Sequence, residues 1–304
     1  MSFTAIDLFA GAGGFTTGAE SAGVKVLWAA NHWPVAVDIH ARNHPDVQHA
    51  CQDLHQADWS QVPAHDVLLA SPACQGHSRA RGKDRPHHDA SRSTAWAVVS
   101  ALEYHRPPAA LIENVPEFME WKLFPAWQMA MNALGYALAP HVIDAADVGV
   151  PQHRRRLFIV ATRSTVPLRL HLPKVEHIPA RAVIDFEAGR WSQVEKPGRA
   201  AATLGRVRAG RAAHGDRFLV AYYGSAKGGR SLDRPLGTLT TRARWAVVDG
   251  DRMRMVNPAE ARAVMGFPDD YQLPRTHKQA HHVLGNAVCP PVAAALLERL
   301  KVAA

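Results

Sequence analysis

The sequence predicts an α/β protein: a doubly wound, mostly parallel sheet with a second, smaller domain. Three observations predict it. In the first half of the chain, short apolar runs alternate with helical patterns, as in successive βαβ units. A glycine-rich turn joins the first apolar run to the first helical pattern. From about residue 163 to residue 256, the chain changes to segments rich in Pro, Gly and Arg.

The first half is expected to supply four buried strands with helices between them. The expected strands are Thr4–Phe9, Val24–Ala30, Val67–Ala70 and Ala109–Ile112. The expected helices are Phe15–Ala22, Pro34–Asn43 and Thr94–His105. Two antiparallel strands then follow, Ala137–Ile143 and Arg156–Thr162, and the residues between them include a turn at Gly149 and Pro151.

The second domain is expected to consist of loops and short strands. Strand-like pieces are Phe218–Tyr223 and Ala246–Val248, and a capped short helix is expected from Pro258. Pro291–Val302 reads as an amphipathic final helix. We expect residues 1–165, completed by residues 280–304, to form the first domain and residues 166–279 to form the second.

Composition favours a folded, cytoplasmic protein with a polyanionic partner. The net charge of +8 favours such a partner because covering phosphates releases counterions, although a biased genome also explains an arginine-rich chain. There is no basic segment followed by an apolar one at the start, and no run of the ~18 apolar residues that a membrane span needs. Cys51, Cys74 and Cys289 lie far apart without a C-x-x-C pair, so neither a disulfide framework nor a zinc ribbon is expected.

The glycines of "AIDLFAGAGGF" suit a ligand that lies across the end of the first strand. Gly11, Gly13 and Gly14 let the backbone pass close to such a ligand, although a purely structural turn explains them as well. The G-x-G-x-x-G motif of dinucleotide-binding proteins would need glycine where Thr16 stands, so the spacing excludes that motif. Asp7, near the strand end, favours a nucleoside-type cofactor.

Cys74 and Glu113 each follow a predicted strand, so both are placed at the carboxyl edge of the sheet, where open α/β sheets hold their sites. A lone cysteine is usually a small buried hydrophobe. Here it lies in a polar loop near arginines, which lower a thiol pKa. A metal site is disfavoured, because the nearby cluster of His77, His87, His88 and Asp89 contains no i, i+4 ligand pair.

Six motifs in order resemble those of the DNA (cytosine-5)-methyltransferases, nearly from end to end. "DLFAGAGGF" is similar to the family's cofactor motif, "SPACQGHS" to its nucleophile motif and "ENV" to its proton-donor motif. "GVPQHRRRLFIV" resembles the Q-x-R-x-R motif. "RPLGTLTTRARW" resembles the motif that supports the recognition domain, and "GNAVCPPVAAAL" resembles the closing motif.

The resemblance implies a mechanism on S-adenosylmethionine and double-stranded DNA. Cys74 would add as a thiolate to C6 of a flipped-out cytosine, and protonated Glu113 would donate to N3. Arg156 would hold the base O2 and orient Glu113. Gln152 and Arg154 match the other two positions of their motif, and Arg154 would position nearby backbone. The polar stretch "RARGKDRPHHDASRST" after the nucleophile fits a lid that closes on DNA, or an ordinary solvated loop.

The resemblance also implies two sets of binding residues. Expected at the cofactor are Asp7, Phe9, Gly11, Gly13, Gly14, Phe15, His32, Trp33, Asp53, Leu54, Asn286 and Val288. Expected at the DNA are Ser78, Arg79, Asn114, Tyr223, Arg230 and Thr240.

Three positions depart from the family pattern. Ala73 precedes the nucleophile where relatives have proline, which stiffens that loop. His32 stands where relatives usually carry an acidic residue for the cofactor ribose, and histidine has no fixed negative charge. His77 fills a site that is often aromatic.

Sequence choice in the family comes from the variable segment, here roughly residues 163–233. Its candidate contacts are Arg190, Trp191, Arg206, Arg208, Arg211, Tyr222, Tyr223, Lys227 and Arg230. Arginine can read a guanine edge or bind a phosphate, and only the first specifies sequence. "YYGSAKGGRS" is the best candidate for a DNA-facing loop, with a structural hairpin as the alternative.

Two alternative functions stay open at this point, a tRNA cytosine-5 methyltransferase of the same fold and a non-catalytic DNA-binding relative. The intact Cys74, Glu113 and Q-x-R-x-R motif argue against the second. The resemblance implies that the protein acts as a monomer and does not associate with a membrane. It also allows a cognate restriction endonuclease as a further partner.

Overall fold

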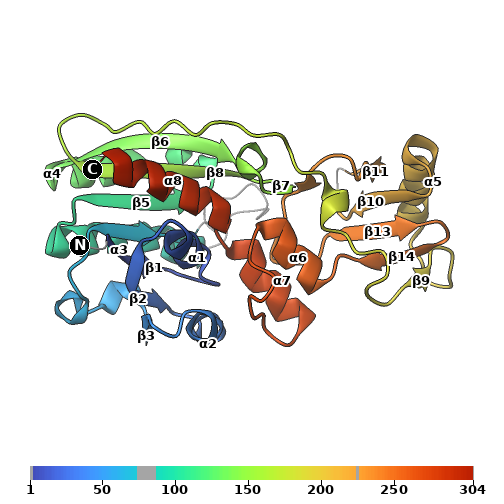
Figure 1. Ribbon diagram of the computed structural model, residues 1–304, viewed down its shortest axis with the longest axis horizontal. Coiled ribbons are helices and arrows are strands. Elements are labelled where there is room, and N and C mark those ends of the chain that lie inside the picture. Colours follow the sequence, from blue (N-terminus) through green and yellow to red (C-terminus); the bar gives the residue numbers. More distant parts are fainter. Residues whose placement is uncertain (1–2, 74–86, 224–225, 304) are drawn as a thin grey trace. The chain divides into compact units, whose positions relative to one another are not determined.

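The computed structural model describes residues 3–73, 87–223 and 226–303, without the side chains of residues 87–93. The chain folds into two compact units, which are described in turn (Figure 1). The first comprises Met1–Val148, Arg155–Lys174 and Ala287–Ala304, and the second comprises Gly149–Arg154 and Val175–Asn286. These limits differ from the expected ones at residues 149–154, 165 and 280. Gly149–Arg154 belongs to the second unit because Gln152–His153 pairs with Leu236–Gly237. Residues 280–286 belong to it because the helix before Ala287 packs on the helix that precedes it.

A seven-stranded sheet forms the centre of the first unit, in the order β3-β2-β1-β4-β5-β8-β6. The strands are β1 Thr4–Leu8, β2 Lys25–Asn31, β3 Gln48–Cys51, β4 Val67–Ala70, β5 Ala109–Asn114, β6 Tyr136–Asp144 and β8 Arg155–Arg163. The first five in this order run parallel, and β8 is antiparallel to both of its neighbours. Every residue of β4 and β5 is buried, as a parallel sheet covered on both faces requires. The predicted doubly wound, mostly parallel sheet is confirmed.

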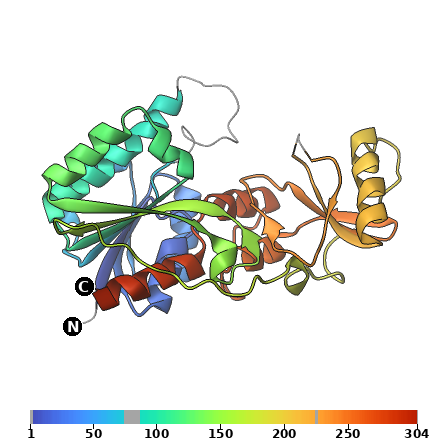
Figure 2. The same cartoon turned by 90° about the horizontal axis from the view of Figure 1, so that it is seen from above.

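Helices cover both faces of this sheet. They are α1 Gly14–Ser21, α2 Pro34–Asn43, α3 His87–His105, α4 Phe124–Ala133 and α8 Pro290–Ala303. Figure 2 shows α3 and α4 on one face and α1 and α8 on the other. The indole N–H of Trp127 in α4 donates to the carbonyl of Ala95 in α3 over 3.0 Å, which fixes the two helices on their face.

Most elements expected in the first unit are present, with their ends shifted by a residue or two. β3 and α4 were not predicted. The polar stretch that ends at Thr94 was expected to be a loop, and this expectation was wrong for its second half, because α3 begins at His87. No proline or glycine follows Pro86 in this stretch, so nothing local stops the helix. The residues of the proposed lid before His87 lie outside the described part of the chain.

The second unit contains a five-stranded sheet in the order β11-β10-β13-β14-β9 and a parallel pair, β12-β7. Its strands are β7 Gln152–His153, β9 Ser192–Gln193, β10 Arg217–Ala221, β11 Gly229–Arg230, β12 Leu236–Gly237, β13 Trp245–Asp249 and β14 Arg252–Met255. Its helices are α5 Ala201–His214, α6 Pro258–Met265 and α7 His277–Asn286.

The core of this unit lies between α5 and the five-stranded sheet. Val207 of α5 packs with Phe218 and Val248. A Cβ atom at Gly210 would lie 2.3 Å from the ring of Phe218, so glycine permits this close approach. Neither α5 nor α7 was predicted. The capped helix from Pro258 is confirmed as α6, whose capping box joins Asn257 and Glu260.

The helical stretch His277–Ala303, which contains α7 and α8, is long and apolar enough to cross a membrane by length and composition alone. However, 67% of its most apolar window is buried inside the protein, and buried core helices pass the same test. The stretch is therefore weak evidence for a membrane span.

Candidate active site

Five adjacent parallel strands of the first unit bring their carboxyl ends to one edge of the sheet. The residues that follow them are those singled out from the sequence: Phe9–Gly14 after β1, His32 and Trp33 after β2, and Asp53 after β3. Ser71–Ala73 follow β4, and Glu113 and Asn114 end β5. In open α/β sheets this edge holds the ligand site.

The glycine loop after β1 is a tight turn with little freedom. Phe9, Gly11 and Gly13 have φ angles of 61°, 57° and 76°, a region that favours glycine. The N–H of Gly13 donates to the carbonyl of Ala10 over 2.8 Å. A Cβ atom at Gly14 would lie 2.1 Å from the carbonyl oxygen of Val288, so the start of α1 rests directly on the backbone before α8.

Several expected cofactor residues form the buried support of this edge. Phe15 is 1% exposed and packs edge-on against Phe158 with ring centroids 6.3 Å apart. Leu54 and Val288 are also buried. His32 and Asp53 are exposed at the edge, and Trp33 is half-buried. One carboxylate oxygen of Asp53 accepts the N–H of His55 over 3.0 Å, which orients that side chain.

Asp7 lies beneath the glycine loop, fully buried. Its Oδ2 accepts the hydroxyl of Thr16 over 2.8 Å, while its Oδ1 has no partner in the described part of the chain. Burial raises the pKa of Asp7 to about 7. Thr16 in turn lies 3.0 Å from Nε2 of His40, and Nδ1 of His40 lies 2.8 Å from Nε2 of His49. Asp7 is therefore part of a buried polar network inside the unit.

The segment that leads to Cys74, the predicted nucleophile, is held by two hydrogen bonds. The amide of Asn114 donates to the carbonyl of Pro72 over 3.1 Å. The N–H of Ala73 donates to the hydroxyl of Thr94 in α3, also over 3.1 Å. Cys74, together with Ser78 and Arg79, lies outside the described residues. Thr94 could not be singled out from the sequence, because it stands in a polar run without an apolar period.

Glu113 and Arg156 form an ion pair on neighbouring strands. Nε of Arg156 lies 3.2 Å from Oε1 of Glu113, and their side chains are 18% and 9% exposed. Glu113 stands opposite Phe158 in the antiparallel β5–β8 register, which puts Arg156 on the adjacent diagonal of the same face. Nη1 of Arg156 also donates to the carbonyl of Arg155 over 2.8 Å. The carboxyl group is thus oriented at the edge that carries Asn114.

Gln152 and Arg154 belong to the second unit, where both are buried. Gln152 accepts the N–H of Leu239 over 2.7 Å, and its amide donates to the carbonyl of Val264 over 3.3 Å. Arg154 donates to the carbonyls of Leu239 and Gly285, each over 3.0 Å. Inside this unit, these two side chains fasten the segment after β12 to α6 and α7.

The other expected residues of the second unit lie around this fastening. The hydroxyl of Tyr223 donates to the carbonyl of Thr238 over 2.7 Å, and burial raises the pKa of Tyr223. Thr240 donates to the carbonyl of Arg242 over 3.1 Å. Arg230, on β11, is exposed, as is Asn286 at the end of α7.

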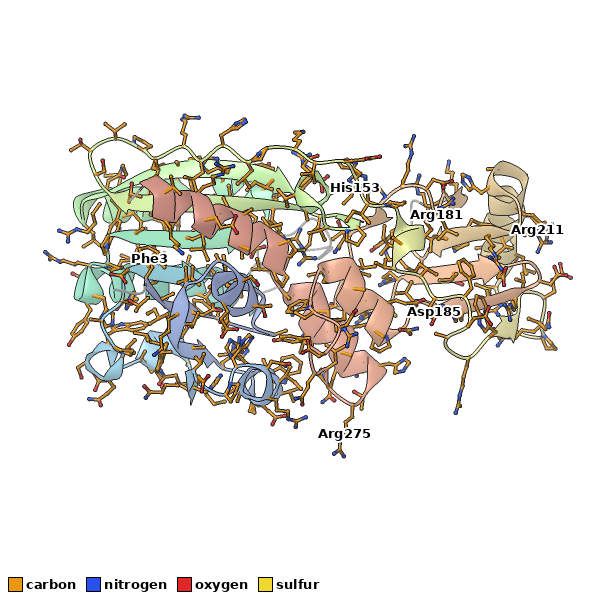
Figure 3. All side chains as sticks on the ribbon, in the orientation of Figure 1. Phe3, His153, Arg181, Asp185, Arg211 and Arg275 are labelled. Carbon is orange, nitrogen blue, oxygen red and sulfur yellow. The ribbon has the colours of Figure 1, made fainter. Side chains whose placement is uncertain are left out.

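Two arginines of the variable segment make contacts within the protein. Nε of Arg206 donates to the carbonyl of Ala226 over 2.9 Å, and Arg211 pairs with Asp251 over 2.9 Å. Arg211 is labelled near α5 in Figure 3.

The chain is similar to known proteins over nearly its whole length. The model of the C-5 cytosine-specific DNA methylase family matches residues 3–196 and 191–302. The type II methyltransferase M.NlaX of Neisseria lactamica is 30% identical over 311 residues, covering 99% of this chain and 97% of that protein. M.HhaI of Haemophilus parahaemolyticus is 28% identical over 311 residues, covering 93% and 89%.

The fold is similar to that of a candidate DNA modification methyltransferase encoded within an E. coli prophage. The TM-score is 0.75 at 20% identity, and the similarity covers 99% of each chain. The chain therefore belongs to the C-5 cytosine-specific DNA methylase family.

Proposed function

We propose that this protein transfers a methyl group from S-adenosylmethionine to C5 of cytosine in double-stranded DNA, with Cys74 as the nucleophile. The observation that carries the proposal is the Glu113–Arg156 pair, 3.2 Å apart, at the sheet edge where the chain enters the nucleophile position. Asn114, the residue after Glu113, holds the carbonyl of Pro72 two positions before Cys74. The proton donor and the approach to the nucleophile are thereby tied to the end of one strand.

The residues after β1, β2 and β3 fit a nucleoside cofactor. The glycine loop is fixed in a turn without side chains at Gly11 and Gly13, which suits a ligand close to the backbone. Trp33 offers an aromatic face, and the exposed carboxylate of Asp53 can accept a hydrogen bond from an amino group. When bound, S-adenosylmethionine supplies an electrophilic methyl group on a sulfonium sulfur. His32 would meet the ribose as a hydrogen-bond donor or acceptor.

The chain's own residues make the target carbon nucleophilic. The thiolate of Cys74 forms a bond to C6 of the base, and Glu113 donates a proton to N3, so no full negative charge develops on the ring. Arg156 orients Glu113 and contacts the base O2. After C5 has taken the methyl group, water takes the C5 proton, the Cys74–C6 bond breaks, and N3 returns its proton to the carboxylate of Glu113. The thiolate leaves and 5-methylcytosine remains.

The target carbon cannot be reached inside a duplex, so the base must leave the stack. We infer that the second unit supplies target recognition and that the first supplies chemistry and cofactor binding. We expect the protein to act as a monomer in the cytoplasm, with a restriction endonuclease as a candidate partner.

The first experiment compares the wild type with Cys74→Ser and with Cys51→Ser, a matched control at an exposed cysteine. Each protein is incubated with methyl-labelled S-adenosylmethionine and either mixed-sequence duplex DNA or tRNA, and the nucleosides are analysed. We expect label in 5-methylcytosine of DNA for the wild type and for Cys51→Ser only. Label in tRNA alone, or undiminished label with Cys74→Ser, would contradict the proposal.

A second readout tests the covalent step. Duplex DNA in which 5-fluorocytosine replaces cytosine cannot lose a C5 proton, so the Cys74–C6 bond should persist. The wild type and Cys51→Ser should therefore give a protein–DNA complex that survives denaturation, and Cys74→Ser should give none.

A further inference from the structure

The second unit contains a cavity of about 1220 Å³ that we call the basic groove. It is lined by four segments: Gly189–Arg190, Thr241–Ala243, Arg254–Asn257 and one face of α7 from His277 to His282. All four belong to the second unit, so the groove is complete within it. Arg190 is the only one of its residues that the sequence suggested as a DNA contact.

The groove carries positive charge that the protein does not neutralise. Its cationic side chains are Arg190, Arg242, Arg254 and Lys278, and no carboxylate is found among its described lining residues. Arg190, Arg242 and Lys278 are exposed, and none has an ion-pair partner in the described part of the chain. Three uncompensated cations facing one cavity attract an anion with several charges.

The fourth cation, Arg254, differs from the other three because it is buried and paired inside the protein. Its guanidinium donates to both carboxylate oxygens of Glu260 over 2.6 and 2.8 Å, and to the carbonyl of Asp185 over 2.6 Å. It also lies 4.8 Å from the ring centre of Trp191. Figure 3 labels Asp185 in this unit. Because Arg254 is buried and paired, it supplies rigidity rather than free charge.

The turn that carries Arg190 packs against the side chain of Arg254. Gly189 has a φ of +81°, and a Cβ atom there would lie 3.0 Å from Cδ of Arg254. Glycine is therefore needed both for the backbone angle and for the close approach. The turn next to Arg190 is thus fixed by Gly189 and Arg254.

The first half of α7 also lines the groove. Nε2 of His281 lies 3.1 Å from the carbonyl of Val256, which joins α7 to the end of β14. Burial lowers the pKa of both His281 and His282, so neither adds charge at neutral pH. The charge of this segment comes from Lys278 in the first turn, where the helix dipole adds to it.

The size and lining of the groove indicate what occupies it. Small-molecule pockets span about 300–1,000 Å³. This groove is larger and carries a cationic side chain on each of its four segments, three of which have no ion-pair partner in the described part of the chain. We propose that the basic groove binds the phosphodiester backbone of duplex DNA through Arg190, Arg242 and Lys278. That the bound polyanion is DNA rests on the proposed function. These phosphate contacts would not depend on the base sequence. They would raise the affinity for DNA and fix the position of the protein along the duplex.

The test measures the salt dependence of DNA affinity in the Cys74→Ser background, so that no covalent chemistry intervenes. The groove variant is Arg190→Ala, Arg242→Ala and Lys278→Ala combined. The control variant combines Lys25→Ala, Lys122→Ala and Arg299→Ala, which removes the same charge from exposed residues of the first unit. Thermal unfolding of both variants checks that they remain folded.

Each phosphate contact contributes about 0.9 to the slope of log K against log salt concentration. On duplex DNA, we expect the magnitude of this slope to be smaller by about 2–3 in the groove variant. At ~0.15 M salt the groove variant should bind DNA at least about tenfold more weakly, and this loss of affinity should be the same for different DNA sequences. The control variant should keep the wild-type slope. An unchanged slope in the groove variant, an equal loss in the control, or a loss confined to RNA would overturn the inference.

The two proposals fail separately. If the wild type forms 5-methylcytosine in DNA while the groove variant keeps its slope, the groove inference falls alone. If no 5-methylcytosine forms but the groove variant loses slope on duplex DNA, the groove stands and the proposed reaction falls.

Discussion

The backbone N–H of Ala73 donates a hydrogen bond to the hydroxyl of Thr94 over 3.1 Å, which fastens the residue before Cys74 to α3. Proline, which the resemblance to the family led us to expect at the position of Ala73, has no N–H and restricts the chain through its ring. In this chain, a hydrogen bond restrains the same position instead. Under the proposed mechanism Thr94 is therefore a positioning residue, because it would act on Cys74 through Ala73.

We expect Thr94→Val, which keeps the shape and removes the hydroxyl, to lower kcat by about tenfold, consistent with a misplaced reacting group. Thr94→Ser should retain most of the activity. Ala73→Pro in the Thr94→Val background should restore kcat, because the ring then supplies the restraint. Single-turnover methylation with saturating DNA measures the effect. If the proline restores nothing while Thr94→Ser is fully active, the hydroxyl has some other role.

The Glu113–Arg156 pair predicts separate effects of its two members. Glu113→Gln keeps the shape but cannot donate a carboxyl proton, so kcat should fall by about 10²–10⁴. Arg156→Lys keeps the charge but loses the fork geometry of guanidinium, and its kcat should fall less. Both variants should retain DNA affinity. A Glu113→Gln protein with wild-type kcat would exclude Glu113 as the proton donor.

The contact between Gly14 and Val288 predicts a packing defect. In Gly14→Ala, the new methyl group would lie 2.1 Å from a carbonyl oxygen, so α1 and the backbone before α8 must separate. We expect a loss of about 1–3 kcal/mol in the free energy of unfolding. Urea denaturation measures it. Gly205 is a matched control, since a Cβ atom there meets nothing within 4 Å, and Gly205→Ala in α5 should stabilise by about 0.5–1 kcal/mol.

The buried network around Asp7 predicts a change in the pH dependence of stability. Asp7 has a pKa of about 7 in the folded protein, so between about pH 4 and 7 it favours the folded state less as the pH rises. His40 acts in the opposite direction, because burial holds its pKa well below the usual range, and stability grows as the pH rises towards 6.5.

Asp7→Asn removes the first effect and leaves the second. We therefore expect the free energy of unfolding to rise more steeply with pH between 4 and 6.5 in Asp7→Asn than in the wild type. Urea titrations over this pH range measure both slopes. Equal slopes would show that Asp7 does not keep its proton in the folded state.

The central sheet could be predicted from sequence because its strands are buried on both faces and read as apolar runs, such as Val67–Ala70. β3 could not, since Gln48–Cys51 is an edge strand with partly exposed residues and no apolar run. α5 was missed because Gly205 and Gly210 lower its helix propensity, and only packing against Phe218 explains the second glycine.

The site shows the same division between local and long-range information. Motifs located Glu113 and Arg156, and strand order placed their ends at one edge. The partners of Gln152 and Arg154 could not be foreseen, because they are backbone carbonyls and N–H groups at Leu239, Val264 and Gly285, which carry no side-chain signature. Thr94 was missed because it hydrogen-bonds 21 residues away.

The Q-x-R-x-R motif is divided between the two units, since Gln152 and Arg154 are buried in the second while Arg156 holds Glu113 in the first. A chimera that exchanged only Val175–Asn286 with a relative would leave both buried side chains facing foreign backbone at three sites. An exchange of specificity between family members should therefore succeed only when the exchanged segment ends before Leu236. The chimera then keeps β12, α6 and α7 from the same protein as its Q-x-R-x-R motif.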